Sequence, residues 1–405
     1  SNLKFRASWG QLGNENALGK YDFLTRIASY NDMYMGYVQG AGSNPWTGSI
    51  ARTLENLPLK WETTDTKNIG FDFGLFGNHL NGNVNYYLNE TRDLLITRRI
   101  APSAGLDNPT LNVGKMRNQG FELELNWNDK INDFEYNVGF NISTIANKVV
   151  ALANEDQTIY GVGLKYGTEH FPTQTKVGKP IGAFYLYQAD GIFQSLEEVQ
   201  AHKNSKGELL QPNAQPGDVR FKDMNGDGVI DEDDKTYSGT GIAKVEANLN
   251  LGASYKGFDF SAVIGSAFGN KIYNGIRYYY EGMNSASNFL KSTLNAWTPT
   301  NTKTDVPRAI YGDPNQNTRE STRFLENGDF VRLRQVQLGY TLTKALSKHI
   351  YCESIRFYVS AENVFTITGY SGANPEFSQG VLNSGVDRFT YPFSRSYTVG
   401  AQVSF

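Results

Sequence analysis

Hydrophobic and polar residues alternate along several segments of this chain, most clearly in its last nine residues. In Tyr397–Phe405 the odd positions are Tyr, Val, Ala, Val and Phe, whereas the even positions are small or polar. A period of two residues predicts a β-strand with one apolar and one polar face. In a soluble sheet such an apolar face packs on a second layer. In an outer-membrane barrel it contacts lipid, and the polar face lines the lumen.

The same alternation recurs along the chain and predicts about ten long strands. They are expected near 3–10, 69–75, 84–88, 121–127, 134–142, 245–255, 258–264, 330–340, 355–361 and 397–405. Residues 330–334 are out of phase with Val336, which predicts a β-bulge between them. A strand-like segment at 181–193 is expected inside a long loop rather than in the barrel wall.

Short and long connections alternate between these strands. The short ones lie near 78–82, 129–132, 256–258 and 342–352, and the long ones near 11–58, 98–117, 150–241, 273–322 and 370–390. This alternation is typical of a transmembrane up-and-down antiparallel β-barrel, with short periplasmic turns and long extracellular loops. The predicted fold class is therefore all-β. The alternative, a soluble propeller or sandwich, is disfavoured because compact domains avoid loops this long.

Composition narrows the possible functions. The formal net charge of −3 excludes a polybasic nucleic-acid binder. The sequence contains no run of 18 apolar residues, so it predicts no membrane-spanning helix. The single cysteine, Cys352, cannot form an internal disulfide. Because alternation already begins at Leu3, we expect the chain to be the C-terminal piece of a longer protein.

The acidic segment 223–234 has the spacing of a calcium-binding loop. Its oxygen ligands would be Asp223, Asn225, Asp227, the carbonyl of Val229, Asp231 and Asp234, at loop positions 1, 3, 5, 7, 9 and 12. Gly228 occupies position 6, where the chain must turn sharply. Asp at position 12 has less bidentate reach than Glu, so we expect a structural Ca²⁺ of modest affinity in an extracellular loop. The alternative is a solvated acidic turn.

Motifs for enzyme chemistry are missing from the sequence. The four histidines show no metal-ligand spacing, and the chain has no P-loop, dinucleotide-binding glycine pattern or nucleophile elbow. We therefore do not expect an enzyme. Aromatic residues in the predicted long loops, Trp46, Tyr279 and Trp297, are candidates for stacking on a ligand, although aromatic residues more often serve to fold such loops.

Several short motifs occur in an order that resembles a known family. They are Leu57–Thr63, Asn68–Phe71, Tyr86–Leu95, Asn118–Glu122, Gly178–Gly182, Asp190–Phe193, Pro216–Asp223, Trp297–Thr302, Asp329–Arg334, Glu362–Phe365 and Tyr370–Glu376. Each motif alone is weak, but their shared order is specific and covers essentially the whole chain. The chain resembles the barrel of TonB-dependent outer-membrane receptors, and within them the SusC-like (starch-utilisation type) transporters of Bacteroidetes.

The resemblance implies a barrel of about 22 strands in the bacterial outer membrane, of which about ten belong to this chain. Residues 1–405 are then one part of that barrel, without the N-terminal plug and first strands. The implied function is TonB-dependent import of oligosaccharides or oligopeptides. The implied partners are a SusD-like lipoprotein, TonB, the N-terminal part of the same protein, and surrounding lipid and lipopolysaccharide. A siderophore-type receptor, a passive porin and, less so, an outer-membrane enzyme remain alternatives.

Overall fold

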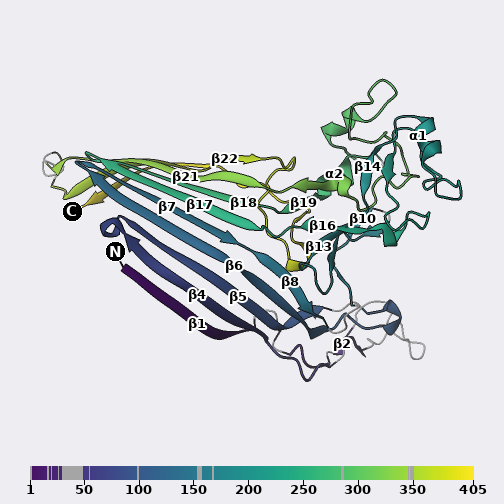
Figure 1. Ribbon diagram of the computed structural model, residues 1–405, viewed down its shortest axis with the longest axis horizontal. Coiled ribbons are helices and arrows are strands. Elements are labelled where there is room, and N and C mark those ends of the chain that lie inside the picture. Colours follow the sequence, from purple (N-terminus) through teal and green to yellow (C-terminus); the bar gives the residue numbers. More distant parts are fainter. Residues whose placement is uncertain are drawn as a thin grey trace, which may run out of the picture.

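The computed structural model places most of the chain in one large sheet and a separate group of loops. It describes residues 2–15, 18–19, 21–25, 27–29, 49–53, 55–97, 100–152, 157–166, 168–283, 287–344, 346 and 351–405. Figure 1 shows the long strands side by side as a curved wall, with most of the long loops gathered beyond one end of it. Tight turns join the strands at the opposite end.

Ten antiparallel strands follow one another across the wall, as the alternation predicted. Their order is β1-β4-β5-β6-β7-β17-β18-β21-β22-β24, and the short β8 pairs with β6 beside this path. The bounds are β1 (Asn2–Asn14), β4 (Glu62–Leu75), β5 (Leu80–Thr97), β6 (Thr110–Ile131), β7 (Phe134–Thr144), β8 (Ala146–Ala151), β17 (Val245–Tyr255), β18 (Phe258–Phe268), β21 (Phe330–Thr341), β22 (Ser354–Thr368) and β24 (Ser396–Ser404). The all-β fold class is confirmed.

Short and long connections alternate between these strands. The short ones span 76–79, 132–133, 256–257 and 342–353. Lys256 and Gly257 both have positive φ, 46° and 89°, the conformation that a two-residue hairpin needs to match the twist of its strands. The long connections span 15–61, 98–109, 152–244, 269–329 and 369–395.

Two predicted boundaries at β6 are wrong. β6 begins at Thr110, so the connection expected at 98–117 ends earlier, and β6 continues to Ile131 through the turn expected at 129–132. The register between β5 and β6 shifts twice between Thr91 and Leu95. These irregularities interrupt the period of two residues, which hid this part of the strand from the sequence pattern.

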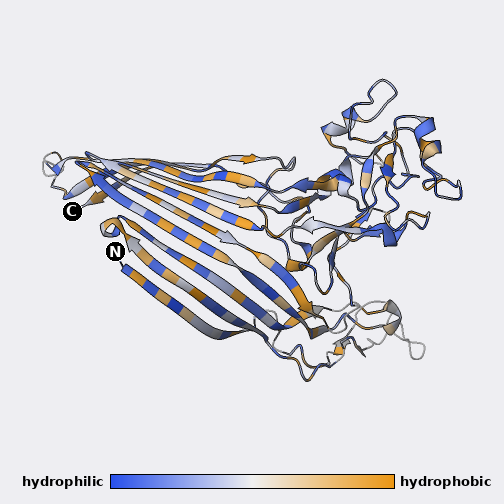
Figure 2. Cartoon of the chain, in the orientation of Figure 1, coloured by the Kyte–Doolittle hydropathy of each residue, from blue (hydrophilic) through white to orange (hydrophobic). Residues whose placement is uncertain are grey.

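The apolar face of the wall is open. Val399 of β24 is 85% exposed and its cross-strand neighbour Val359 of β22 is 49% exposed. Phe357 and Leu338 on the same face are also exposed. Figure 2 shows the alternation of hydrophobic and hydrophilic positions along the long strands. Within the described residues, no second protein layer covers this face, as expected if lipid covers it.

The opposite face carries polar bridges between strands. Arg356 of β22 donates to both carboxylate oxygens of Asp259 of β18, at 2.9 and 2.5 Å. The pair reaches over β21 at Gly339, where an added Cβ would lie 2.4 Å from Asp259 Oδ1. A side chain at position 339 would therefore separate the two charges. Such bidentate pairs hold three strands in register.

The predicted bulge lies in β21 at Arg334. The register shifts between Leu333 and Gln335 in the pairing with β22, and opposite them in the pairing with β18. The extra residue reverses the phase of the strand. Arg332 therefore points to the polar side although Val336, four residues later, pairs with Ala262 and Ala361 on the apolar side.

The remaining described residues of 152–244, 269–329 and 369–395 form what we call the loop domain. Its strands are β9 (Ile159–Tyr160), β10 (Leu164–Tyr166), β11 (Thr168–His170), β12 (Thr173–Thr175), β13 (Ala183–Leu186), β14 (Ala189–Ile192), β15 (Val219–Phe221), β16 (Thr236–Thr240), β19 (Lys271–Asn274), β20 (Leu325–Asn327) and β23 (Val386–Asp387). They form small sheets, β16-β13-β12-β9, β14-β15, β10-β11 and β20-β19-β23. β13 and β14 account for the strand-like segment 181–193, which lies outside the wall as predicted.

Short helical segments complete the structure. They are α1 (Leu196–Ala201), α2 (Gly275–Tyr280) and the 3₁₀ turns Phe76–Asn78, Pro102–Ala104, Glu232–Asp234, Lys291–Asn295, Thr322–Phe324 and Val381–Asn383, and a separate hairpin pairs β2 (Ile27–Ser29) with β3 (Ser49–Ala51). Ser195 caps α1 by accepting a hydrogen bond from the amide of Glu198. No helix in the described part of the chain is long and apolar enough to cross a membrane.

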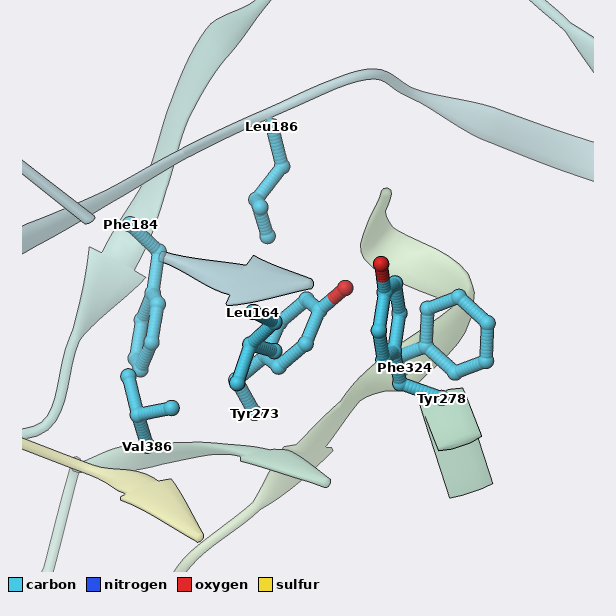
Figure 3. Close-up of a cluster of buried hydrophobic side chains, with 7 residues drawn as sticks. All are labelled: Leu164, Phe184, Leu186, Tyr273, Tyr278, Phe324 and Val386. Atoms are coloured by element: carbon cyan, nitrogen blue, oxygen red, sulfur yellow. The ribbon is translucent and has the colours of Figure 1, made fainter. Parts of the chain in front are cut away.

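The loop domain has its own hydrophobic core, drawn in Figure 3. The core consists of Leu164, Phe184, Leu186, Tyr273, Tyr278, Phe324 and Val386. These residues come from all three long segments of the loop domain, and each is completely buried. The ring of Phe324 lies 5.8 Å from that of Tyr273 and 5.7 Å from that of Tyr278. The loops therefore fold as one packed unit.

We predict that Val399→Arg destabilises the assembled barrel. An arginine on the lipid face costs about 2–4 kcal/mol near the bilayer midplane. Thr398→Arg, one residue away on the opposite face of β24, is the matched control and should be tolerated. Heat-modifiable gel mobility of the barrel in native membranes measures both. Equal heat stability of wild type and Val399→Arg would show that this face does not contact hydrocarbon.

Candidate functional site

A cavity of about 890 Å³ opens in the loop domain. Its lining comes from β9, from β11 and the residue after it, from the residue after β13, from the turn before β16 and from the segment 312–320. These parts lie far apart in the sequence. The lining residues are Tyr160, Glu169, His170, Phe171, Tyr187, Glu232, Lys235, Gly312, Asp313, Pro314, Gln316, Thr318, Arg319 and Glu320. The lining combines aromatic rings with charged groups, a composition suited to a polar ligand of appreciable size.

A buried ion network forms one side of this cavity. Lys235 Nζ lies 2.5 Å from Glu320 Oε1 and 2.5 Å from Glu232 Oε2, and His170 Nδ1 is hydrogen-bonded to Glu320 Oε2. The side chains of Lys235 and Glu320 are 4% and 5% exposed. The pair is therefore shielded from water and depends on these contacts.

The pKa values in this network favour the ionised forms. Burial by itself would raise the pKa of Glu320, but the hydrogen bond from His170 and the charge of Lys235 outweigh it and lower the pKa to about 2. Burial would lower the pKa of Lys235, but the charge of Glu320 and the contacts with Glu232 raise it. Both shifts describe the same stable ion pair.

Arg319 also lines the cavity, and its side chain packs against two aromatic rings. The centre of its guanidinium is 5.0 Å from the ring centroid of Tyr187 and 4.6 Å from that of Phe221. The Tyr187 hydroxyl donates to Glu232 Oε1 at 3.2 Å, and burial followed by the nearby Glu232 charge raises the pKa of Tyr187. Burial of the guanidinium lowers the pKa of Arg319.

The last long segment of the loop domain, 369–395, is held to the wall by two arginines. Arg332 of β21, which is 3% exposed, donates to Asn374 Oδ1 at 2.6 Å and to Glu376 Oε2 at 2.9 Å. Arg334 donates to the other oxygen of Glu376 at 2.9 Å. Farther along, β23 pairs with β19 inside the loop domain. The segment therefore ties the cavity-bearing domain to the interior side of the wall.

The acidic segment 223–234 forms a closed loop around its own carboxylates. Asp223 accepts from the amides of Gly226 and Gly228, at 2.6 and 2.9 Å. Gly228 has φ +93°, the turn expected at this position. Asp234 is completely buried and accepts from the amides of Met224 and Asp231. Among the described residues, no group of three or more His, Cys, Asp or Glu side chains is placed to hold a metal ion. Calcium binding stays a prediction.

The three aromatic candidates differ in placement. Trp46 lies outside the described residues. The Tyr279 hydroxyl accepts from the amide of Lys165 at 3.0 Å, and its ring stacks on Phe389. Trp297 is 8% exposed and donates from Nε1 to Gln194 Oε1 at 2.9 Å. Tyr279 and Trp297 thus help to pack the loop domain, and a contact with ligand stays a prediction.

Comparison with known proteins establishes the family. A family model described as "TonB dependent receptor-like, beta-barrel" matches residues 1–364. The chain belongs to the TonB-dependent receptor β-barrel family. The predicted resemblance and the outer-membrane location are thereby confirmed.

Relatives at the level of the whole sequence agree with this family. The chain is 29% identical to TonB-dependent receptor P3 of Formosa agariphila, over 99% of this chain and 39% of that protein. It is 26% identical to TonB-dependent receptor SusC of Bacteroides thetaiotaomicron, over 100% of this chain and 38% of that protein. The chain therefore spans about two fifths of the length of the TonB-dependent receptors that it matches.

A solved structure shares the architecture of this TonB-dependent receptor barrel. The structure of the RagAB peptide transporter matches 100% of this chain and 41% of that chain, with a TM-score of 0.78 and 26% sequence identity. The match covers the wall and the loop domain together. It supports the arrangement of both parts.

Sequence reasoning missed the cavity altogether. Lys235 and Glu320 are 85 positions apart, and His170 is 150 positions from Glu320. None of them lies in a motif with recognisable spacing. Only Lys235 lies next to a predicted site, because it directly follows the acidic loop 223–234. No signal in the sequence indicates that these residues meet.

We predict that Glu320 makes the loop domain acid-sensitive. Its pKa is lowered from 4.5 to about 2, so its stabilisation is complete above about pH 4.5 and is lost as pH falls through 2. The shift corresponds to roughly 3 kcal/mol. The stability difference between wild type and Glu320→Gln should shrink by that amount over this pH range, measured by pepsin susceptibility in increasing urea.

Glu169→Gln is the matched control for this prediction. Glu169 lines the same cavity but is exposed, so its substitution should leave the acid profile unchanged. A Glu320→Gln profile parallel to wild type between pH 4.5 and 2 would contradict the assignment.

Proposed function

We propose that this chain is part of an importer that moves oligosaccharides or oligopeptides across the outer membrane with energy supplied through TonB. The observation that carries the proposal is the likeness to the RagAB peptide transporter over 100% of this chain, loop domain included. Membership of the TonB-dependent receptor family supports the energy source. The likeness to SusC supports a SusD-like surface lipoprotein as partner.

In the proposed mechanism this chain contributes the wall and part of the capture site. The apolar face contacts lipid and lipopolysaccharide, and the polar face lines the lumen. The cavity of about 890 Å³ in the loop domain receives part of the cargo on the extracellular side. Arg332 and Arg334 keep segment 369–395 against the wall, so that the cavity stays above the lumen. The plug, on the N-terminal part of the same protein, opens the path when TonB pulls on it.

The cargo class is left as oligosaccharide or oligopeptide. The likeness to the RagAB peptide transporter favours peptides. The polar and aromatic lining of the cavity suits either class. A siderophore-type receptor would use the same barrel with a different ligand, and an outer-membrane enzyme would convert its ligand rather than move it.

We predict that uptake by cells depends on the proton motive force. A fluorescent peptide digest and a fluorescent oligosaccharide digest are offered to cells that carry the full-length protein and to cells that lack it. Accumulation of at least one digest should require the protein, stop with a protonophore, and stop when TonB is deleted. Uptake that survives both treatments would identify a passive porin, and chemical change of the cargo outside the cell would identify an enzyme.

We also propose that segment 223–234 binds a structural Ca²⁺. The ligand spacing supports it, together with the positive φ of Gly228 and the closed backbone around Asp223 and Asp234. Loops of this type on the outside of cells bind Ca²⁺ at about 10⁻⁴–10⁻³ M. The ion would hold the long connection between β8 and β17 in one conformation.

We predict that Ca²⁺ in this concentration range protects residues 194–240 from proteolysis in the full-length protein, and that EDTA removes the protection. Asp227→Asn should weaken the effect because it removes the negative charge of the ligand at loop position 5. Asp233→Asn is the matched control, since the exposed Asp233 lies outside the ligand positions. Identical digestion in Ca²⁺ and in EDTA would mean that the loop is an acidic turn without an ion.

A further inference from the structure

Arg319 differs from the other arginines of the described part of the chain. Each of the others that is buried or half-buried has a carboxylate within 4.0 Å. In the loop domain Arg277 pairs with Glu281, Arg308 with Asp218 and Arg323 with Glu281. In the same domain, Arg220 pairs with Asp190. Outside the loop domain, a carboxylate partner is also present for Arg52, Arg117, Arg332, Arg334 and Arg356. Arg319 has none among the described residues.

The hydrogen bonds of Arg319 leave most of its donors available. Nη2 donates to Gln316 Oε1 at 3.1 Å, and Nε is buried without a partner. The ring centroids of Tyr187 and Phe221 lie 5.0 and 4.6 Å from the guanidinium and restrict its movement. A buried donor that lacks an acceptor costs free energy. Because Nε is shielded, a ligand in the cavity would accept from the Nη atoms, of which only Nη2 has a hydrogen bond to the described residues.

The acids of the cavity do not supply the missing acceptor. Glu320 is engaged by Lys235 and His170, and Glu232 by Lys235. Asp313 accepts from the amide of Thr318 at 2.9 Å and from its hydroxyl at 2.6 Å. Arg319 is therefore the cation on the cavity wall whose charge is not balanced by direct contact with an acid.

We propose that Arg319 binds a carboxylate of the cargo inside this cavity. The planar guanidinium matches the two oxygens of a carboxylate, and its packing against two rings means that little side-chain freedom is lost on binding. The carboxylate belongs either to an oligopeptide, at its C-terminus or an acidic side chain, or to a uronic acid of an oligosaccharide. This inference rests on the proposed function and specifies the chemistry of the cargo.

The test compares cargo pools with and without free carboxylates. A casein digest and a pectin digest are each used before and after methyl esterification. Binding to the purified full-length transporter with its lipoprotein partner is measured by equilibrium dialysis and mass spectrometry. Esterification should weaken binding of one pool by roughly ten- to a hundredfold, the range for a hydrogen bond to a charged group. The pool that responds identifies the source of the carboxylate.

Arg319→Gln should remove the preference for the unesterified pool. The matched control is Arg220→Gln, because Arg220 is a half-buried arginine of the same domain that lies outside the cavity lining and pairs with Asp190. Arg220→Gln should keep the preference. If Arg319→Gln does not fold, Arg319→Lys keeps the charge but loses the fork, and should reduce the preference severalfold.

Two results would overturn the inference: equal binding of esterified and unesterified pools by wild type, or an unchanged preference in folded Arg319 variants. Its failure is separable from that of the proposed function. Energy-dependent uptake without any carboxylate preference defeats only this inference. A carboxylate preference that depends on Arg319, combined with energy-independent uptake, defeats only the proposed mechanism of transport.

Discussion

The absence of water at the apolar face is the constraint on which the rest of the wall depends. In hydrocarbon, every backbone N–H and C=O must find its partner within the protein, so strands survive there only as neighbours in a continuous sheet. The long antiparallel path from β1 to β24 meets that demand between its two edge strands. The same constraint forces side chains to alternate between lipid and lumen, and the sequence shows that alternation over most strands.

The polar face can carry charged side chains, which the apolar face cannot. Charged residues can be hydrated in a lumen, so bridges such as Arg356–Asp259 are possible across three strands. Near the loop end, the bulge at Arg334 turns Arg332 toward this side, where both arginines hold Glu376 of segment 369–395. One irregularity in one strand thus couples the membrane-spanning wall to the domain that carries the cavity. A wall without the bulge would direct Arg332 toward lipid, where a charge is costly.

Most of the fold could be predicted, and most of the site could not. The strands, the bulge before Val336 and the exclusion of 181–193 from the wall followed from alternation and its breaks, because these are local consequences of backbone geometry. The start of β6 at Thr110 could not be predicted, because the register shifts in the facing part of β5 interrupt the period of two residues. The cavity could not be predicted either, since Lys235, Glu320 and His170 are brought together only by the packing of three long loops around one hydrophobic core.

The sequence by itself determined which face of each strand is apolar, how the strands are connected, and where the acidic loop lies. These properties depend on residues a few positions away along the chain, so they can be predicted from the sequence alone. Tertiary structure alone decided that Glu320 is ionised with a pKa of about 2 and that Arg319 lacks a carboxylate partner. Burial and charge pairing depend on which residues are close in space. His170 and Glu320, which are 150 positions apart along the chain, come into contact only when the loops fold.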